Sequence, residues 1–205
     1  AGNSGVIGPG DVQWMTAASG SVHEELHEKE WAKHGGTLQA IQLWVNLPKS
    51  SKMSAPGYQT IVNDQIPVVQ LDGGGGSLRV IAGSVGSAKG PAKTFTPIEL
   101  YDLRLRAGHS MPLQIPKGYN VGLLVLSGQA SVEGSHRLSE AELAVFVSTG
   151  EPVTIAAEED ATILVMAGEA IDEPVARYGP FVMNTKAELV QAVNDYNAGK
   201  MGHLA

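Results

Sequence analysis

Short apolar segments separated by turn residues form the dominant pattern along this chain of 205 residues. Most of these segments are rich in β-branched side chains, and Gly, Pro, Ser or Asn stands between them. This spacing predicts an antiparallel sandwich or barrel rather than alternating strands and helices. The predicted strands are Val12–Thr16, Leu38–Leu47, Leu78–Ala82, Ile98–Leu105, Val121–Leu126, Ala130–Val132, Ala144–Val147, Val153–Ala156 and Thr162–Ala167.

Two stretches have the features of helices instead. Near the C-terminus, Asn184 or Thr185 can cap a helix, Thr185 and Glu188 have the spacing of a capping box, and Gly199 is a typical helix stop. One apolar face would then hold Leu189, Val190, Val193 and Tyr196. The second stretch is Ser21–His34, whose chemistry is considered below.

Composition excludes several classes of protein. The chain has no Cys, which excludes disulfides, thiolate metal sites and a Cys nucleophile. Its 21 acidic and 14 basic residues give a net charge of −7, which argues against direct nucleic-acid binding. No apolar run predicts a membrane span, and the first residues do not resemble a signal peptide. We therefore expect a cytoplasmic protein.

A glycine-rich segment, Asp72–Ser77, invites comparison with phosphate-binding loops. It lacks the Lys-Ser/Thr ending of such loops, and a predicted strand rather than a helix follows it. We interpret this segment as a flexible turn.

Histidine and glutamate concentrate between residues 23 and 34, where one interpretation is a zinc peptidase. His23-Glu24-x-x-His27 fits the H-E-x-x-H pattern, in which a helix presents both histidines to zinc and the glutamate acts as general base. Against this, His34 lies seven residues after His27 rather than six, and no long helices are predicted to support the site.

The same residues have two further interpretations. In an extended segment, His23 and Glu25 point to the same face and suit a borderline divalent metal on the wall of a β-barrel. On this view Glu24 points outward, and Gly20 allows the chain to bend into the strand. The simplest alternative is a solvated strand end that leads into a short acidic helix, 24–33.

Several motifs then point to one family. The segments Gly5–Ala17 (GVIGPGDVQWMTA), Gly20–Glu25 (GSVHEE), Gln42–Pro48 (QLWVNLP), Val80–Gly83 (VIAG) and Tyr178–Thr185 (YGPFVMNT) resemble signatures of the pirin family of bicupins. They occur in the same order and cover nearly the whole chain.

The resemblance implies an all-β bicupin: two stacked antiparallel barrels, the first incomplete at its N-terminus, with a C-terminal α-helix. Residues 1–58 would belong to the metal-binding barrel and residues 59–205 to the second barrel and the helix. In the family, three histidines and a glutamate hold one metal, usually iron; manganese or nickel is also possible. His23 and Glu25 match the third histidine and the glutamate.

One departure concerns the other two ligands. The family places them in an H-x-H motif upstream of Gly5, and this sequence contains no H-x-H. We expect them in a missing upstream segment. Either the chain has been cut and the upstream fragment stays bound noncovalently, or the sequence is incomplete at this end. The alternative is a shortened protein that has lost the metal. His109, His136 and His203 are interpreted as surface residues rather than a second metal site.

The resemblance also implies an activity. It is quercetin 2,3-dioxygenase chemistry on a flavonol-like substrate, with ring opening and release of carbon monoxide, provided that the missing ligands are supplied. Glu25 would serve as both ligand and catalytic base. Trp14, Met15 and Trp44 would line the cavity or fill the core. The alternatives are a metal-binding regulator that acts through a protein partner, and a structural remnant with neither metal nor activity.

Overall fold

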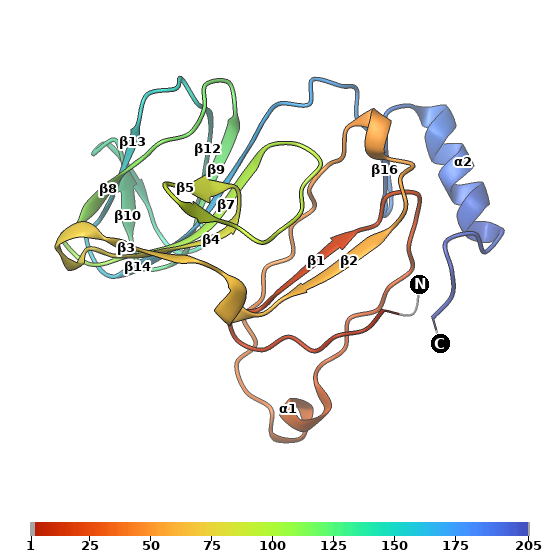
Figure 1. The fold of residues 1–205 in the computed structure, drawn as a ribbon, viewed down its shortest axis with the longest axis horizontal. Coiled ribbons are helices and arrows are strands. Elements are labelled where there is room, and N and C mark those ends of the chain that lie inside the picture. The colour runs from red at the N-terminus through yellow and green to blue at the C-terminus, as the bar shows by residue number, and fades with distance from the viewer. Residues whose placement is uncertain (1–2, 205) are drawn as a thin grey trace. The chain divides into compact units, whose positions relative to one another are not determined.

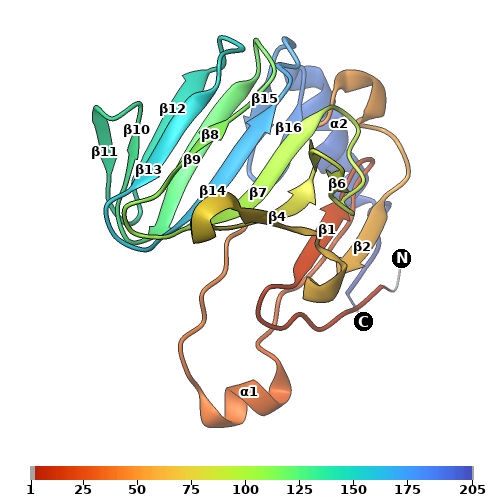
Figure 2. The same cartoon turned by 60° about the vertical axis from the view of Figure 1, so that its left-hand side comes forward.

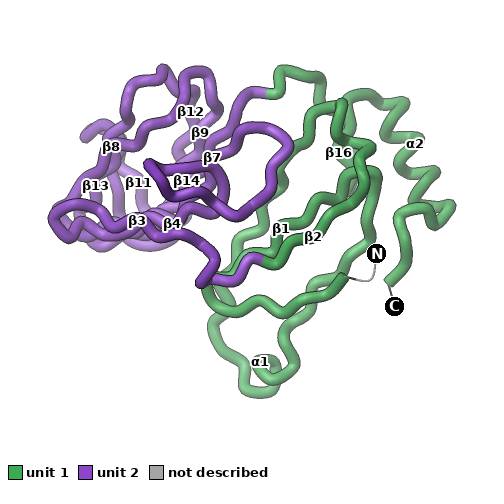
Figure 3. The backbone as a smooth tube through the Cα atoms, viewed as in Figure 1, with its two compact units in different colours: residues 1–60, 171–205 green, residues 61–170 purple. Residues whose placement is uncertain are grey.

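The chain divides into two compact units in the computed structural model, which describes residues 3–204 (Figure 3). One unit comprises residues 1–60 and 171–205, and the other comprises residues 61–170. The C-terminal helix therefore belongs to the same unit as the N-terminal residues. The domain boundary predicted after residue 58 places this helix in the second domain instead.

Residues 61–170 form two antiparallel sheets (Figures 1 and 2). The strand orders are β12-β9-β14-β7-β4-β3 in the larger sheet and β11-β10-β13-β8 in the smaller sheet. The strands are β3 (Val68–Leu71), β4 (Gly76–Ala82), β7 (Ile98–Leu105), β8 (Ser110–Leu113), β9 (Asn120–Ser127), β10 (Ala130–Val132), β11 (His136–Leu138), β12 (Leu143–Val147), β13 (Val153–Ala157) and β14 (Ala161–Gly168). A hairpin of β5 (Ser84–Val85) and β6 (Ala88–Lys89) accompanies them.

Every strand predicted from Leu78 onward lies within an observed strand. The glycine-rich segment is a turn as predicted, with a short 3-10 helix at Asp72–Gly74 followed by β4. The prediction missed short strands such as β8, which contains Pro112 and lies at the edge of its sheet. Proline is compatible with an edge strand, but in a sequence it argues against any strand.

Apolar side chains from both sheets fill the interior of this unit. Leu103, Leu123, Val125 and Val165 are fully buried and belong to one hydrophobic cluster, to which strands of both sheets contribute. Because alternate residues of a strand face opposite sides, the same strands carry their polar residues on the other face. The sheets therefore pack around a filled core.

An ion pair lies on the opposite face of the larger sheet. Arg79 of β4 and Asp102 of β7 are cross-strand neighbours in register, and their Nη1 and Oδ2 atoms are 2.7 Å apart. Both residues are buried, and Arg79 Nη2 also donates to Asn63 Oδ1 at 2.9 Å. The side chain of Arg104, 3.4 Å from the same carboxylate, is largely exposed.

The other unit has less regular structure. It contains β1 (Val12–Thr16) paired with β2 (Gly57–Ile61), β15 (Ala176–Tyr178) paired with β16 (Phe181–Met183), and the helices α1 (Lys29–His34) and α2 (Lys186–Asn197). A 3-10 helix occupies Lys49–Ser51. The predictions of β1 and of the C-terminal helix are confirmed. The predicted strand 38–47 is wrong, because no strand among residues 3–204 pairs with it.

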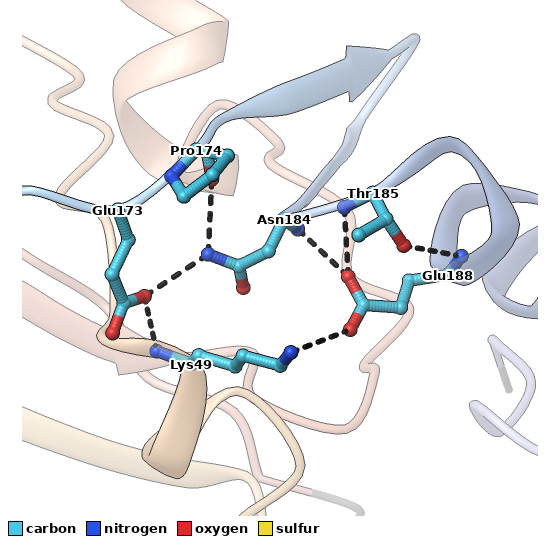
Figure 4. Close-up of polar contacts among 6 residues, drawn as sticks. All are labelled: Lys49, Glu173, Pro174, Asn184, Thr185 and Glu188. Atoms are coloured by element: carbon cyan, nitrogen blue, oxygen red, sulfur yellow. Dashed lines mark hydrogen bonds and ion pairs between the residues drawn. The ribbon is translucent and has the colours of Figure 1, made fainter.

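Polar contacts tie the C-terminal segment to residues 46–52 within this unit (Figure 4). Glu173 Oε2 accepts hydrogen bonds from Lys49 N at 2.8 Å and from Asn184 Nδ2 at 3.0 Å. The buried Lys52 Nζ donates to Asn46 Oδ1 at 2.5 Å and to Val182 O at 3.4 Å. Burial lowers the pKa of Lys52.

The first turn of α2 completes this network with the predicted capping box. Thr185 Oγ1 accepts from Glu188 N at 3.2 Å, and Glu188 Oε2 accepts from the backbone N–H groups of Asn184 and Thr185. Desolvation acts to raise the pKa of Glu188, but these hydrogen bonds outweigh it and lower the pKa below its usual value of 4.5.

We predict that Asp102→Ala lowers the free energy of unfolding by about 3 kcal/mol, because the buried Arg79 guanidinium loses its counter-charge. Chemical denaturation measures the change. Arg104→Ala removes an exposed charge from the same cluster and should cost less than about 1 kcal/mol. Equal losses in the two variants would contradict this account of the ion pair.

We also predict a pH-dependent effect of Glu188→Gln. Because the pKa of Glu188 is lower in the folded state than in the unfolded state, its stabilising contribution is present above the unfolded value and is lost as the pH falls through the folded value. The difference in Tm between the wild type and the variant should therefore be largest near neutral pH and should vanish in acid. The same series on Glu159→Gln, an exposed position, supplies the control. A difference that does not change with pH would refute the prediction.

Candidate functional site

The residues singled out from the sequence lie in the exposed segment 21–47, which loops out around α1 (Figure 2). His23 and Glu25 are both exposed, and neither belongs to a helix or a strand. The expectation of a strand-borne pair is therefore not met in these residues. The expected acidic helix is also shorter than predicted, because α1 begins only at Lys29.

The H-E-x-x-H interpretation is wrong for this structure. It requires a helix that carries both His23 and His27, and both lie before α1. His27 instead packs edge-on against Trp31, with ring centroids 5.0 Å apart. Glu28 caps α1 by accepting from Trp31 N at 2.8 Å, and this bond lowers the pKa of Glu28. These contacts give His27 and Glu28 a structural role.

Glu25 has a specific partner from a distant part of the sequence. Gln42 Nε2 donates to Glu25 Oε1 at 2.8 Å, so the segment 20–28 and the segment 38–47 meet at this carboxylate. In the sequence, Gln42 stands out only as the first residue of a family motif, and no role is predicted for it. A lone glutamine has no spacing signature, so only the folded chain could reveal this contact.

The chain enters the His23 segment through a tightly packed turn. Gly20 has a φ of +125°, and a Cβ at this position would lie 2.6 Å from Met201 Sδ. Val22, the residue before His23, donates its backbone N–H to Met201 O at 3.2 Å. The positive φ of Gly20 therefore favours glycine, and its missing side chain leaves space for that of Met201.

Several apolar side chains of the same region are exposed. Trp44 is 62% exposed and Leu38 is 61% exposed. The expectation that Trp44 and Met15 line a cavity or fill the core is not met, since Met15 is also exposed, whereas Trp14 is partly buried. The segment has the sequence of a buried strand without a pairing strand in the described part of the chain.

The donor atoms fit a divalent metal in kind but not in number. Imidazole nitrogen and carboxylate oxygen are ligands for iron, manganese and nickel. Mononuclear sites normally use three or four protein ligands, and residues 3–204 hold no group of three or more candidate ligands. His23 and Glu25 by themselves are therefore too few to make a complete mononuclear site.

The histidines interpreted as surface residues, His109, His136 and His203, have other surroundings. His109 contacts backbone oxygens, with Nδ1 3.1 Å from Ala107 O and Nε2 3.3 Å from Gly73 O. His136 and His203 are exposed. The hydrophobic cluster between the sheets of residues 61–170 includes Tyr101, whose hydroxyl donates to Glu99 and lies 3.1 Å from Ser84 O. Burial raises the pKa of Tyr101 far above its usual value.

No helix within residues 3–204 is long and apolar enough to cross a membrane.

Comparison with known proteins gives matches along the whole chain. The family model for pirin matches residues 1–45, and the model for the pirin C-terminal cupin domain matches residues 100–202. A Pseudomonas aeruginosa protein, whose name assigns it provisionally to the quercetin 2,3-dioxygenases, is 46% identical over 199 residues that cover 97% of this chain and 69% of the relative. A pirin-like protein of Caulobacter vibrioides is 42% identical over 97% of this chain and 70% of its own length.

A solved structure shows the same fold. The crystal structure of quercetin 2,3-dioxygenase from Acinetobacter baumannii matches with a TM-score of 0.94 and 45% identity, over 100% of this chain and 71% of that one. The fold class expected from the sequence, an all-β cupin, is thereby confirmed. On these matches, together with the ordered motifs and the sheet topology, the chain belongs to the pirin family of cupin proteins.

Proposed function

We propose that this protein works as a metal-dependent oxygenase of the quercetin 2,3-dioxygenase type, in which His23 and Glu25 are two of the metal ligands. Two observations support the proposal. The chain is 45% identical to a solved quercetin 2,3-dioxygenase over its full length. Glu25 and its partner Gln42 also come from two separate segments that carry motifs of the family.

The remaining ligands would be two histidines supplied from outside the printed sequence, either by the same polypeptide or by a noncovalently bound fragment. Iron is the metal that we favour, with manganese or nickel as alternatives. The substrate is a flavonol-like small molecule with a hydroxyl group beside a carbonyl group. The proposal places the protein in the cytoplasm, without a membrane or nucleic-acid partner.

The residues of this chain would control the position of a proton. A bound divalent metal favours the deprotonated form of a hydroxyl group that coordinates it. Gln42 holds one oxygen of Glu25 through a hydrogen bond of 2.8 Å, which leaves Oε2 available to accept the proton of the substrate hydroxyl. Glu25 is thus the catalytic base of the proposal, and Gln42 fixes the orientation of its carboxylate.

A second candidate function is a metal-binding regulator that acts through a protein partner. The surface around α1 favours this alternative. Leu26 is 79% exposed, and the acidic residues Glu24, Glu28 and Glu30 beside it are exposed as well. An exposed leucine among acidic groups suits a basic, partly apolar protein surface. Flavonol turnover distinguishes the two functions, because a pure adaptor has none.

We predict that His23→Ala removes the metal from the full-length protein, whereas His27→Ala leaves it in place. Elemental analysis should find about one metal ion per chain in the wild type and in His27→Ala, and well below that in His23→Ala. The two variants are matched, since both residues are exposed histidines of one segment. Full metal occupancy in His23→Ala would refute the ligand assignment, and loss in His27→Ala would restore the peptidase interpretation.

We further predict that the metal-loaded protein consumes quercetin and dioxygen and releases carbon monoxide. Glu25→Gln should lower turnover by at least about 100-fold, since it removes both a ligand and the base. Gas analysis and the loss of flavonol absorbance measure the reaction. A metal-loaded protein without turnover would contradict the oxygenase proposal and favour the regulator.

A further inference from the structure

The chain continues past the end of α2 into a short tail, residues 198–204, which folds back on the helix. Lys200 N donates to Asp195 O at 3.0 Å, and Lys200 Nζ lies 2.6 Å from Asp195 Oδ1. Gln191 Nε2 donates to the same carboxylate oxygen at 2.9 Å. The backbone and the side chain of Lys200 therefore both attach the tail to the last turns of α2, directly before Met201.

Met201 joins this tail to the residues that precede His23. Its backbone oxygen accepts from Val22 N at 3.2 Å. Its side chain is partly buried and occupies the space beside Gly20, where an added Cβ would lie 2.4 Å from Met201 Cγ and 2.9 Å from Met201 Cε. A hydrogen bond and close packing therefore hold the same short segment against the tail.

The segment that carries the candidate ligands has little regular structure of its own. Residues 21–28 lie outside any helix or strand, and His23 and Glu25 are exposed. At one end, Gln42 holds the carboxylate of Glu25. At the other end, the hydrogen bond to Met201 lies one residue before His23. The path of the backbone between these two points therefore depends on both contacts.

We propose that Met201 is a positioning residue that fixes the direction in which the chain presents His23 and Glu25. This inference rests on the proposed function, in which these two side chains are metal ligands. Residues that orient metal ligands without touching the metal typically contribute about 10- to 100-fold to metal affinity. Met201 acts in this way through the backbone of residues 20–22.

Gly20 and Met201 form a matched pair. The φ of Gly20 is +125°, a conformation that favours glycine, and the bare backbone leaves room for a long side chain. Methionine is unbranched and flexible, so it adapts to such an irregular space. A shorter side chain at position 201 leaves the space empty, and a larger residue at position 20 excludes the methionine.

Hydrogen exchange in the metal-free chain of 205 residues tests the contact. In Met201→Ala, the Val22 amide should exchange at least about tenfold faster than in the wild type, because local opening costs less free energy. Met201→Leu should restore slow exchange, since leucine conserves the volume. Met53→Ala is the matched control, because Met53 belongs to the same unit and is 64% exposed. In this control, the Val22 amide should exchange as in the wild type.

Metal affinity tests the positioning role in the full-length protein, which supplies all of the proposed ligands. Titration of the metal-free protein with Mn²⁺, followed by electron paramagnetic resonance, should give a Kd about tenfold higher for Met201→Ala than for the wild type. Met201→Leu and Met53→Ala should bind like the wild type. Circular dichroism establishes that each variant is folded during the titration. A purely structural role of Met201 would lower Tm and leave the Kd unchanged.

Gly20→Ala tests the pairing of the two residues. In the wild-type background, the added Cβ collides with the Met201 side chain and should accelerate exchange at Val22. In the Met201→Ala background, the colliding atoms are absent, so the same change should have a smaller effect. Additive effects of the two substitutions would contradict a direct contact.

Two results overturn the inference, and one separates it from the proposed function. Exchange at Val22 that is unchanged in Met201→Ala overturns it. So does faster exchange with an unchanged Kd for Mn²⁺, because Met201 then holds the segment without positioning the ligands. A full-length wild type that binds no Mn²⁺ contradicts the proposed function. In that case, faster exchange at Val22 in Met201→Ala still supports the role of Met201 in holding the segment.

Discussion

Two sheets that must each bury one apolar face determine the structure of residues 61–170. Leu103, Leu123 and Val165 leave no exposed area, and their neighbours on both sheets fill the space between them. Each fully buried side chain of this kind contributes roughly 1.5–3 kcal/mol to folding. The same packing makes the interior unsuitable for chemistry, because apolar side chains occupy the space that a metal and a substrate would need. The candidate ligands lie accordingly in the other unit.

The unit of residues 1–60 and 171–205 is held together by different means. Its sheets have only two strands each, and polar contacts join segments far apart in the sequence. Lys52 and Asn184 are 5% exposed and hold their hydrogen-bond partners inside the structure. A buried polar group is costly unless it is paired, so such a network permits few alternative arrangements. The C-terminal segment thereby fixes residues 46–52, which overlap the end of the segment 38–47 that carries Gln42.

The two exposed regions of interest have a common physical origin. The segment 38–47 and the strand β12 both carry apolar side chains in extended chain without a pairing strand in the described residues. An extended apolar segment gains stability when its backbone groups and its side chains are covered together. The segment 38–47 lies next to Glu25, where we propose that further ligands are supplied. β12 lies on the other unit, at an edge of the larger sheet.

Much of the fold could be predicted from the sequence because its signals are local. β-Branched runs bounded by turn residues located β4, β7, β9 and β14, and Thr185 with Glu188 located the start of α2. The ordered motifs identified the family, and the His-x-Glu spacing singled out His23 and Glu25. The absence of an H-x-H motif also led to the expectation that the sequence carries only part of a ligand set.

The rest depended on contacts between distant residues, which no local pattern encodes. The alternation of residues 38–47 predicted a strand, but a strand forms only where a partner supplies hydrogen bonds. The H-E-x-x-H match predicted a helix, but α1 begins at Lys29, where Glu28 caps it. The bond from Gln42 to Glu25, the packing of Met201 against Gly20 and the open edge of β12 exist only in the folded chain. The sequence by itself determined the family and the strands, whereas tertiary structure decided which side chains meet and which edges remain open.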